Sequence, residues 1–175
     1  DLPGLAPENR VLGVIRPTAE VIGNYSQSKF IGVMATNGTV QSESYILEIR
    51  KFFPDIHVLQ QACPMWVPLI ENNEQKSKGA DFFIKKYIHN LLHREERIDT
   101  ILLACTHYPL MIKKIKEYMP ADMKLLSQGD IVADSLFDYL HRHPEMETRL
   151  SKNGSRDFFT TDSTADFDGH TLAFF

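Results

Sequence analysis

One stretch, residues 99–110, constrains the fold of this chain more than any other. It reads Asp-Thr-Ile-Leu-Leu-Ala-Cys-Thr-His-Tyr-Pro-Leu. The apolar and β-branched run at 100–104 is typical of a fully buried strand, and Pro109 suits the first turn of a helix that follows directly. Ligands of open α/β sheets bind outside the carboxyl ends of the strands. The stretch therefore predicts a buried strand that delivers a thiol, a hydroxyl, an imidazole and a phenol to a functional site.

The rest of the chain alternates strands and helices in the same way. Further strands are predicted at 30–35, 56–62, 124–127 and 158–161, and helices at 18–25, 40–53, 81–93, 109–119 and 130–141. The connecting segments are predicted to be an irregular lead-in at 1–9, a strand or crossing segment at 11–15, and a rigid loop at 63–70 that contains two prolines. Alternation at this spacing indicates an α/β fold with a mostly parallel sheet flanked by helices.

Composition narrows the classes of partner. The chain has 175 residues, of which 43% are hydrophobic and 24% charged, as in an ordinary globular protein. Its formal net charge of -4 argues against a nucleic-acid partner. No apolar run approaches the roughly 20 residues that cross a bilayer, and residues 1–10 lack the regions of a secretory signal. We therefore expect a cytoplasmic protein with neither a nucleic-acid nor a membrane partner.

The two cysteines, Cys63 and Cys105, are not part of a Cys-x-x-Cys pair. Free thiols in a reducing compartment are expected, and a disulfide between them is the alternative. Cys63 precedes a proline in an apolar segment without a nearby base, so we expect it to be structural. No metal site is expected, because the other histidines are scattered without ligand spacing: His57, His89, His93, His141, His143 and His170.

Cys105 is the candidate reactive residue. A lone cysteine at a strand end is more often an inert small hydrophobe, but here a helix N-terminus and His107 both favour the thiolate. Thr106 can bind a substrate carboxylate through its hydroxyl and backbone. Thr36 and Thr39 follow another predicted strand and are expected at the same sheet edge. The alternatives are a packing or capping role for His107 and plain turn and N-cap roles for Thr36 and Thr39.

Taken together, these motifs resemble those of the glutamate racemases, members of the aspartate/glutamate racemase superfamily. Residues 104–110, Ala-Cys-Thr-His-Tyr-Pro-Leu, are similar to the signature Gly-Cys-Thr-His-Tyr-Pro-Leu. Residues 32–39 resemble the family's Gly-Val-x-Gly-Thr-x-x-Thr turn, and residues 62–69 its Ala-Cys-Pro-x-Phe-Val-Pro-Leu loop. Residues 127–129, Ser-Gln-Gly, stand where the family has Asp-Ser-Gly. His107 favours glutamate as substrate, because related aspartate racemases usually carry Glu at this position.

The resemblance implies a domain layout. The family has two α/β domains that face each other across the substrate, and each domain provides one catalytic cysteine. By that layout, residues 1–10 are a lead-in, residues 11–127 form the second domain, and residues 128–175 are a return segment belonging to an incomplete first domain. The first-domain Asp-Ser-Gly and Cys-Asn-Thr motifs are not found in this sequence. The chain is thus expected to hold half of a site, to be inactive alone, and to pair with the missing first domain.

The resemblance also implies a chemistry, the cofactor-independent interconversion of L- and D-glutamate by two cysteines acting on opposite faces of the α-carbon. Cys105 would be one base and His107 would assist its proton transfer, while Thr106 and Thr36 would bind the substrate. D-glutamate for peptidoglycan in a bacterial cytoplasm, and a possible homodimer, follow from the same resemblance.

Two alternatives stay open: another racemase or isomerase of the superfamily, acting on aspartate, hydantoins or maleate, and a non-catalytic binding module. The apolar face of helix 131–140 also predicts self-association.

Overall fold

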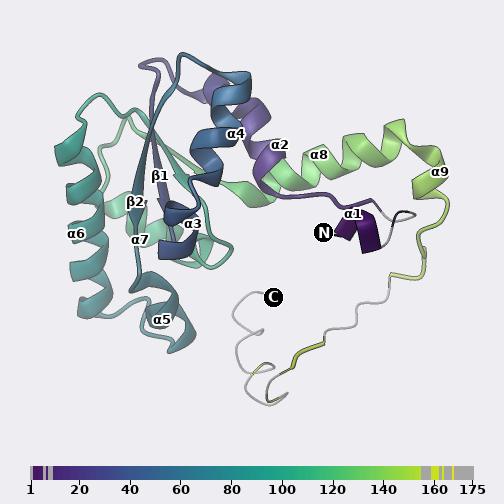
Figure 1. Cartoon of the computed structure of the whole chain (residues 1–175). Coiled ribbons are helices and arrows are strands. Elements are labelled where there is room, and N and C mark those ends of the chain that lie inside the picture. The colour runs from purple at the N-terminus through teal and green to yellow at the C-terminus, as the bar shows by residue number, and fades with distance from the viewer. Residues whose placement is uncertain are drawn as a thin grey trace.

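The computed structural model describes residues 2–5, 7, 10–154, 159–161, 163 and 167. A parallel sheet with the strand order β2-β1-β3-β4 forms its centre (Figure 1). The strands are β1 (Phe30–Ala35), β2 (His57–Ala62), β3 (Thr100–Leu103) and β4 (Lys124–Ser127). The predicted α/β class and these four strands are confirmed. The predicted fifth strand is wrong at residues 159–161, which are not extended strand, and residue 158 lies outside the described residues.

Helices connect and flank these strands. In chain order they are α1 (Leu2–Leu5), α2 (Ile15–Val21), the 3-10 helix η1 (Ile22–Tyr25), α3 (Asn37–Gln41), α4 (Ser44–Phe52), α5 (Trp66–Glu71), α6 (Lys78–Arg94), the 3-10 helix η2 (Tyr108–Met111), α7 (Ile112–Glu117), α8 (Gln128–Arg142) and α9 (Pro144–Glu147). Each strand except β4 leads into a helix that returns the chain to the opposite end of the sheet, as parallel pairing requires.

The alternation of side chains along the strands divides the core into two layers. Ile31, Val33 and Leu102 pack with α2 and α4 on one face. Met34 and Leu103 pack with α5, α6 and α7 on the other. Gly32 lies where α6 approaches β1 closely, since a Cβ at this position would come within 2.6 Å of the Leu91 side chain. Both faces are covered, which explains why β1 and β3 are continuous apolar runs.

Two predicted helices differ in their bounds. The helix predicted at 40–53 is two helices, α3 and α4, because Glu43 adopts a left-handed backbone conformation (φ 52°) between them. The helix predicted at 18–25 begins earlier, at Ile15, and its last turn is the 3-10 helix η1. Thr18 is therefore not an N-cap: it is buried inside α2, and its hydroxyl donates to the Val14 carbonyl at 3.3 Å.

Three loop and helix predictions also need correction. Residues 63–70 are not a rigid loop, because α5 begins at Trp66; Pro68 is tolerated in its first turn, where backbone N–H groups have no helical partner. The lead-in contains a helical turn, α1. The helix predicted at 109–119 begins instead with the 3-10 turn η2 and ends at Glu117.

Asp99 fixes the amino end of the sheet. Its carboxylate accepts hydrogen bonds from the Ser26 hydroxyl (2.6 Å) and from the backbone N–H groups of Gln27 and Ser28 (2.7 Å each). The Thr100 hydroxyl donates to it as well, at 3.0 Å. Burial alone would raise the pKa of Asp99, but these four donors outweigh burial and hold the pKa at about 2. The carboxylate thus joins the loop before β1 to the start of β3.

α8 leaves the α/β body and extends away from the sheet (Figure 1). The Gln128 amide at its start donates to the Val14 carbonyl (3.4 Å) and the Thr18 hydroxyl (3.3 Å), which attaches α8 to α2. Leu136 and Phe137, farther along α8, are exposed. Within the described ranges, no helix is both long enough and apolar enough to span a membrane.

Candidate active site

The strand register brings two of the predicted site residues, Thr36 and Cys105, to one edge of the sheet. Met34 of β1 pairs with Leu103 of β3, and the Ala104 N–H donates to the Met34 carbonyl at 2.9 Å. Thr36 and Cys105 each follow this pair by two residues, so they emerge at the same level from neighbouring parallel strands. Thr36 and Thr39 are expected at the same sheet edge as Cys105, and for Thr36 this register supports the expectation.

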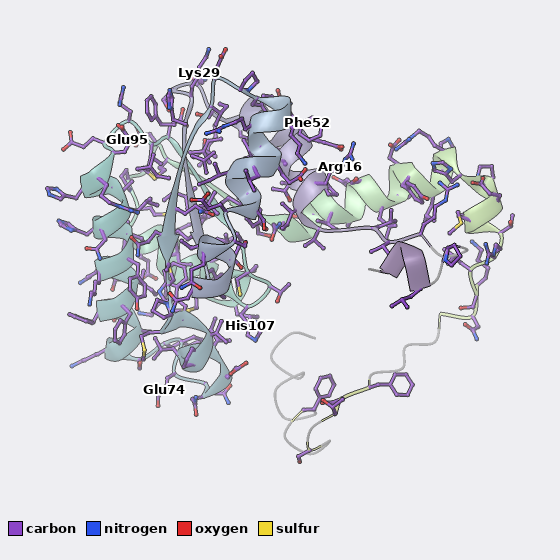
Figure 2. All side chains as sticks on the ribbon, in the orientation of Figure 1. Arg16, Lys29, Phe52, Glu74, Glu95 and His107 are labelled. Atoms are coloured by element: carbon purple, nitrogen blue, oxygen red, sulfur yellow. The ribbon has the colours of Figure 1, made fainter. Side chains whose placement is uncertain are left out.

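At this edge, Cys105, His107 and Glu71 form a chain of contacts. The Cys105 sulfur lies 4.0 Å from Nδ1 of His107, and Nε2 of the same ring lies 3.3 Å from a carboxylate oxygen of Glu71. Glu71 is the last residue of α5, which packs against η2 directly after the thiol. Figure 2 shows His107 at the α5 end of the molecule, near Glu74 and far from Lys29 and Glu95. A carboxylate, an imidazole and a thiol in sequence can pass a proton.

The structure contradicts the expectation that Cys105 is shifted toward thiolate. Burial raises the pKa of the Cys105 thiol above its ordinary value. The backbone N–H groups of His107 and Tyr108, in the turn into η2, lower the pKa as predicted, but the Glu71 carboxylate raises it again. The net direction is upward, so Cys105 is a protonated thiol at neutral pH. In this state the Cys105 thiol can donate a proton, and the His107 ring nitrogen 4.0 Å away faces it.

Hydroxyl groups lie beside this chain of contacts. Thr36 caps α3: its Oγ1 accepts from the Thr39 N–H at 3.4 Å and lies 3.0 Å from the Thr39 hydroxyl. The predicted turn and cap are confirmed, and both side chains are half-buried. Thr106 is exposed between Cys105 and His107. These groups can donate to a carboxylate placed over the sheet edge.

The second cysteine has a different environment. Cys63 is 1% exposed, and burial raises the pKa of its thiol far above the ordinary value. Its carbonyl accepts a hydrogen bond from the Tyr108 hydroxyl at 3.2 Å, and the Tyr108 ring packs edge-on against Trp66 at 4.8 Å. Both cysteines are free. Cys63 is therefore buried in the core packing at the end of β2, as a structural cysteine would be.

Tyr45 and Gln128 lie behind Cys105. Tyr45 is buried in the α2–α4 layer, and burial raises its pKa to about 12. A hydrogen bond with the Gln128 side chain lowers this pKa, while the nearby Cys105 raises it. The start of α8 also lies beside the end of β3, because Ser127 pairs with Leu103.

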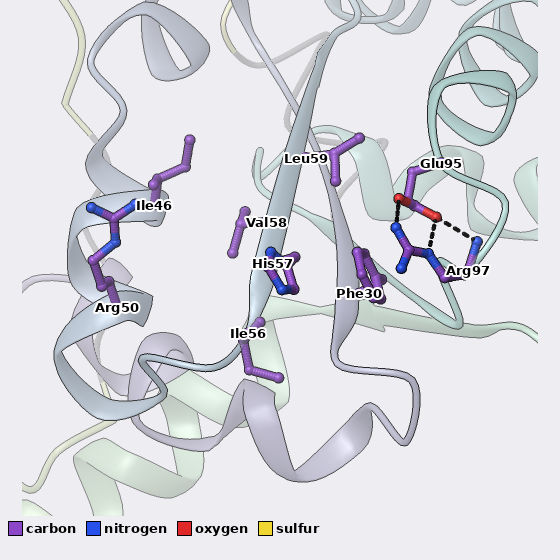
Figure 3. A pocket seen from close by; sticks show the side chains of 9 residues that line it. All are labelled: Phe30, Ile46, Arg50, Ile56, His57, Val58, Leu59, Glu95 and Arg97. Atoms are coloured by element: carbon purple, nitrogen blue, oxygen red, sulfur yellow. Dashed lines mark hydrogen bonds and ion pairs between the residues drawn. The ribbon is translucent and has the colours of Figure 1, made fainter.

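A separate hollow of about 440 Å³ lies at the amino ends of the strands. It is lined by Phe30, Ile46, Arg50, Ile56, His57, Val58, Leu59, Glu95 and Arg97 (Figure 3). Phe30 stacks on His57 at 4.7 Å, and the Arg97 guanidinium lies 3.8 Å from the Phe30 ring centre. Glu95 forms an ion pair with Arg97 at 2.7 Å, so the carboxylate of Glu95 already neutralises the positive charge of the Arg97 guanidinium. None of the predicted site residues lines this hollow.

The chain is similar in sequence and in fold to known proteins. No family model matches the chain. Over 157 residues it is 33% identical to the glutamate racemase of Geobacter metallireducens, a match that spans 90% of this chain and 57% of that protein. The identity to the glutamate racemase of Thermoanaerobacter sp. is 36% over 154 residues, or 88% of this chain and 57% of that protein.

This chain is homologous to the glutamate racemases. Two solved structures agree with it in fold. The glutamate racemase isoform from Bacillus anthracis has a TM-score of 0.83 at 28% identity, covering 99% of this chain and 64% of that one. The glutamate racemase from Francisella tularensis, solved in complex with D-glutamate, has a TM-score of 0.84 at 26% identity, covering 99% and 62%. The chain therefore spans less than two thirds of these homologues.

Glu71 is the site residue that the sequence did not reveal. The sequence that begins at Glu71 is polar and predicts an exposed segment. The prolines at 64 and 68 argue against a helix in the preceding residues, although α5 forms there and ends at Glu71. The spacing of Trp66 and Ile70, four residues apart, is a sequence signal for a helix. Both side chains are buried in the structure, where α5 packs against η2 and places Glu71 beside His107.

Proposed function

We propose that this chain supplies one half of the active site of a glutamate racemase. The observation that carries the proposal is the contact chain from Glu71 through His107 to Cys105, placed at the carboxyl end of a buried parallel strand. Homology to glutamate racemases over 90% of the chain supports glutamate as the substrate, and the D-glutamate complex from Francisella tularensis supports it further.

In this proposal Cys105 exchanges a proton with the α-carbon of glutamate. As a thiol, it gives its proton to the carbanion, so that the S–H bond breaks and a C–H bond forms. In the opposite direction, the thiolate left after proton transfer to His107 removes the α-proton. Glu71 orients His107, because its carboxylate oxygen lies 3.3 Å from Nε2 of the ring. Thr106 and Thr36 bind the substrate carboxylate and help to hold the α-carbon against the sulfur.

Inversion needs a second base on the opposite face of the α-carbon. Cys63 cannot provide it, because its sulfur is buried and protonated. We assign the second base to a cysteine of a first domain, which faces residues 11–127. Residues 128–175 are the return segment toward that domain, and residues 1–10 the lead-in. A cytoplasmic location, supply of D-glutamate for peptidoglycan in a bacterium, and a homodimer belong to the same proposal.

The test is exchange of the α-hydrogen of L-glutamate for deuterium in D₂O, followed by proton NMR without added pyridoxal phosphate. We expect exchange with the protein at its full natural length and a loss of roughly 100-fold or more in the Cys105→Ala variant. Cys63→Ala is the matched control and is expected to keep the exchange. No exchange by the full-length protein would leave the non-catalytic binding module as the better explanation.

Two further measurements separate the remaining alternatives. Faster α-hydrogen exchange with aspartate or a hydantoin than with glutamate, or cis–trans isomerisation of maleate, would assign the chain to another activity of the superfamily. His107 is the residue that argues against these activities. Residues 1–175 alone are expected to show no turnover, because one face of the α-carbon lacks a base. Turnover by this chain alone would contradict the division into halves but not the role of Cys105.

A further inference from the structure

We propose that His89 and His93 of α6 form a binding site for a divalent transition-metal ion that prefers nitrogen ligands, such as Cu²⁺, Ni²⁺ or Zn²⁺. The expectation that the remaining histidines are scattered overlooks the spacing of this pair, four residues apart on one helix. The proposed site is independent of the proposed racemase function, because it lies on the outer surface of α6 and uses none of the residues around Cys105.

The two imidazoles have the geometry of a chelating pair. An α-helix has 3.6 residues per turn, so side chains four apart lie on the same face, one above the other. The ring centres of His89 and His93 are 5.6 Å apart and their planes differ by 12°. A metal–nitrogen bond of about 2.1 Å requires one nitrogen of each ring to approach the other to about 3 Å. Rotation about the side-chain torsions of two exposed rings provides this approach.

The helix beneath the pair is firmly held. α6 has 17 residues, and its opposite face is buried in the core through Ile84, Ile88 and Leu91. The spacing of the two Cα atoms is therefore fixed before a metal binds, which reduces the ordering cost of binding. Among the described residues, neither imidazole has a hydrogen-bond partner that a metal ion would have to displace.

The surrounding charge suits a cation. Both histidines line a groove of about 630 Å³ between α6 and the end of α7, together with Glu96, Glu117 and Lys85. The Lys85 ammonium lies 4.7 Å from the Tyr118 ring centre, in a cation–π contact. Two carboxylates and one ammonium leave the groove negative.

The ligand set indicates which ions fit. No group of three or more potential ligands occurs in the part of the chain that the structure describes, so water must complete the coordination. Two imidazoles favour borderline ions, in the order Cu²⁺ above Ni²⁺ and Zn²⁺, over Mg²⁺ and Ca²⁺, which prefer oxygen.

Calorimetric titration of the protein with nickel chloride tests the proposal, since Ni²⁺ avoids the thiol oxidation that Cu²⁺ causes. We expect binding of one equivalent per chain, no heat with magnesium chloride, and a rise in melting temperature with Ni²⁺. His89→Gln and His93→Gln are each expected to abolish both the stoichiometric binding and the rise. Both positions are exposed, so circular dichroism of the variants is expected to match that of the original chain.

A double variant, Asn90→His with His93→Gln, provides the matched control. It keeps the number of histidines but places two of them next to each other, where they point in different directions. Loss of binding in this variant supports a chelating pair. The proposal is overturned if the original chain binds no Ni²⁺ stoichiometrically, or if the His89→Gln/His93→Gln variant binds it equally well.

Discussion

The Nε2 atom of His107 lies 3.3 Å from a carboxylate oxygen of Glu71, while Nδ1 of the same ring faces the Cys105 sulfur at 4.0 Å. A carboxylate that accepts the proton of Nε2 leaves Nδ1 as the acceptor in neutral imidazole. The ring is then oriented to receive the thiol proton. The same carboxylate also raises the pKa of Cys105. Glu71 therefore contacts the imidazole that faces the thiol and also disfavours the thiolate form of Cys105.

Glu71→Gln should lower the pKa of Cys105, because the variant removes a negative charge that disfavours the thiolate. The rate of alkylation by iodoacetamide, followed by mass spectrometry from pH 6 to 10, is expected to reach its half-maximal value at a lower pH than in the original chain. Glu74→Gln is the control, since it removes the same charge from an exposed position three residues farther along the chain. An unchanged profile in Glu71→Gln would contradict the electrostatic role of Glu71.

Iodoacetamide should modify only one of the two cysteines in the folded protein. Cys105 is half-buried and reachable, whereas Cys63 is sealed behind Tyr108 and Trp66. The modification rate should rise above pH 9, because burial raises the pKa of the Cys105 thiol above its ordinary value. Peptide mapping identifies the modified residue. Equal labelling of Cys63 without denaturant would show that the strand end is open.

Gly32→Ala should destabilise the fold by about 1–3 kcal/mol through overpacking. The added methyl would come within 2.6 Å of Leu91, which α6 holds against β1. The free energy of unfolding is obtained from urea denaturation. Gly13→Ala, where a Cβ meets nothing within 4 Å, should leave this free energy almost unchanged. Equal effects of the two substitutions would contradict the close packing of α6 on β1.

Asp99→Asn should cost about 1–3 kcal/mol at pH 7, because a carboxylate that accepts several hydrogen bonds is replaced by a neutral amide. The pKa of Asp99 is about 2 in the folded chain, below the value of about 3.9 in an unfolded one. The contribution of the Asp99 carboxylate to the free energy of unfolding is therefore fully present above about pH 4, and it is lost as the pH falls from about 4 toward about 2. Urea unfolding at pH 7 and pH 2.5 measures the two free energies.

The difference in the free energy of unfolding between Asp99→Asn and the original chain should be smaller at pH 2.5 than at pH 7. Asp55→Asn is the control, because Asp55 makes only an exposed ion pair with Lys29 at 3.5 Å. A difference that stays constant with pH would mean that Asp99 acts through shape and not through its charge.

The exposed apolar residues of α8 should cause association of the isolated chain. Leu136 and Phe137 are 44% and 76% exposed, and Val11 and Leu12 expose further apolar surface. Sedimentation velocity is expected to show a concentration-dependent shift toward larger species. Phe137→Ser combined with Leu136→Ser should reduce that shift. A clean monomer of the original chain at high concentration would contradict this prediction.

The sequence predicted the sheet better than the helices. Short apolar runs such as 30–35 and 100–103 favour a single kind of element, a strand buried on both faces of the sheet. Both strands were predicted correctly. The predicted helix boundaries were wrong where the backbone conformation of one residue interrupts the helical periodicity of apolar residues. Glu43 does this between α3 and α4. The prediction that Cys105 is shifted toward thiolate was wrong for another reason. The pKa of the thiol depends on its burial, and burial results from contacts between α5, η2 and the sheet that no local sequence pattern encodes.

The attachment of α8 at Gln128 has a mechanical consequence. The helix has 15 residues and begins one residue after β4, whose Ser127 is in register with Leu103. Its length is about 22 Å, so a tilt of about 10° around Gln128 swings the far end by about 4 Å. Gln128 itself lies beside the end of β3, two residues before Cys105. A structure fixed to the far end of α8 would then move by several ångströms relative to Cys105, which is held by the sheet.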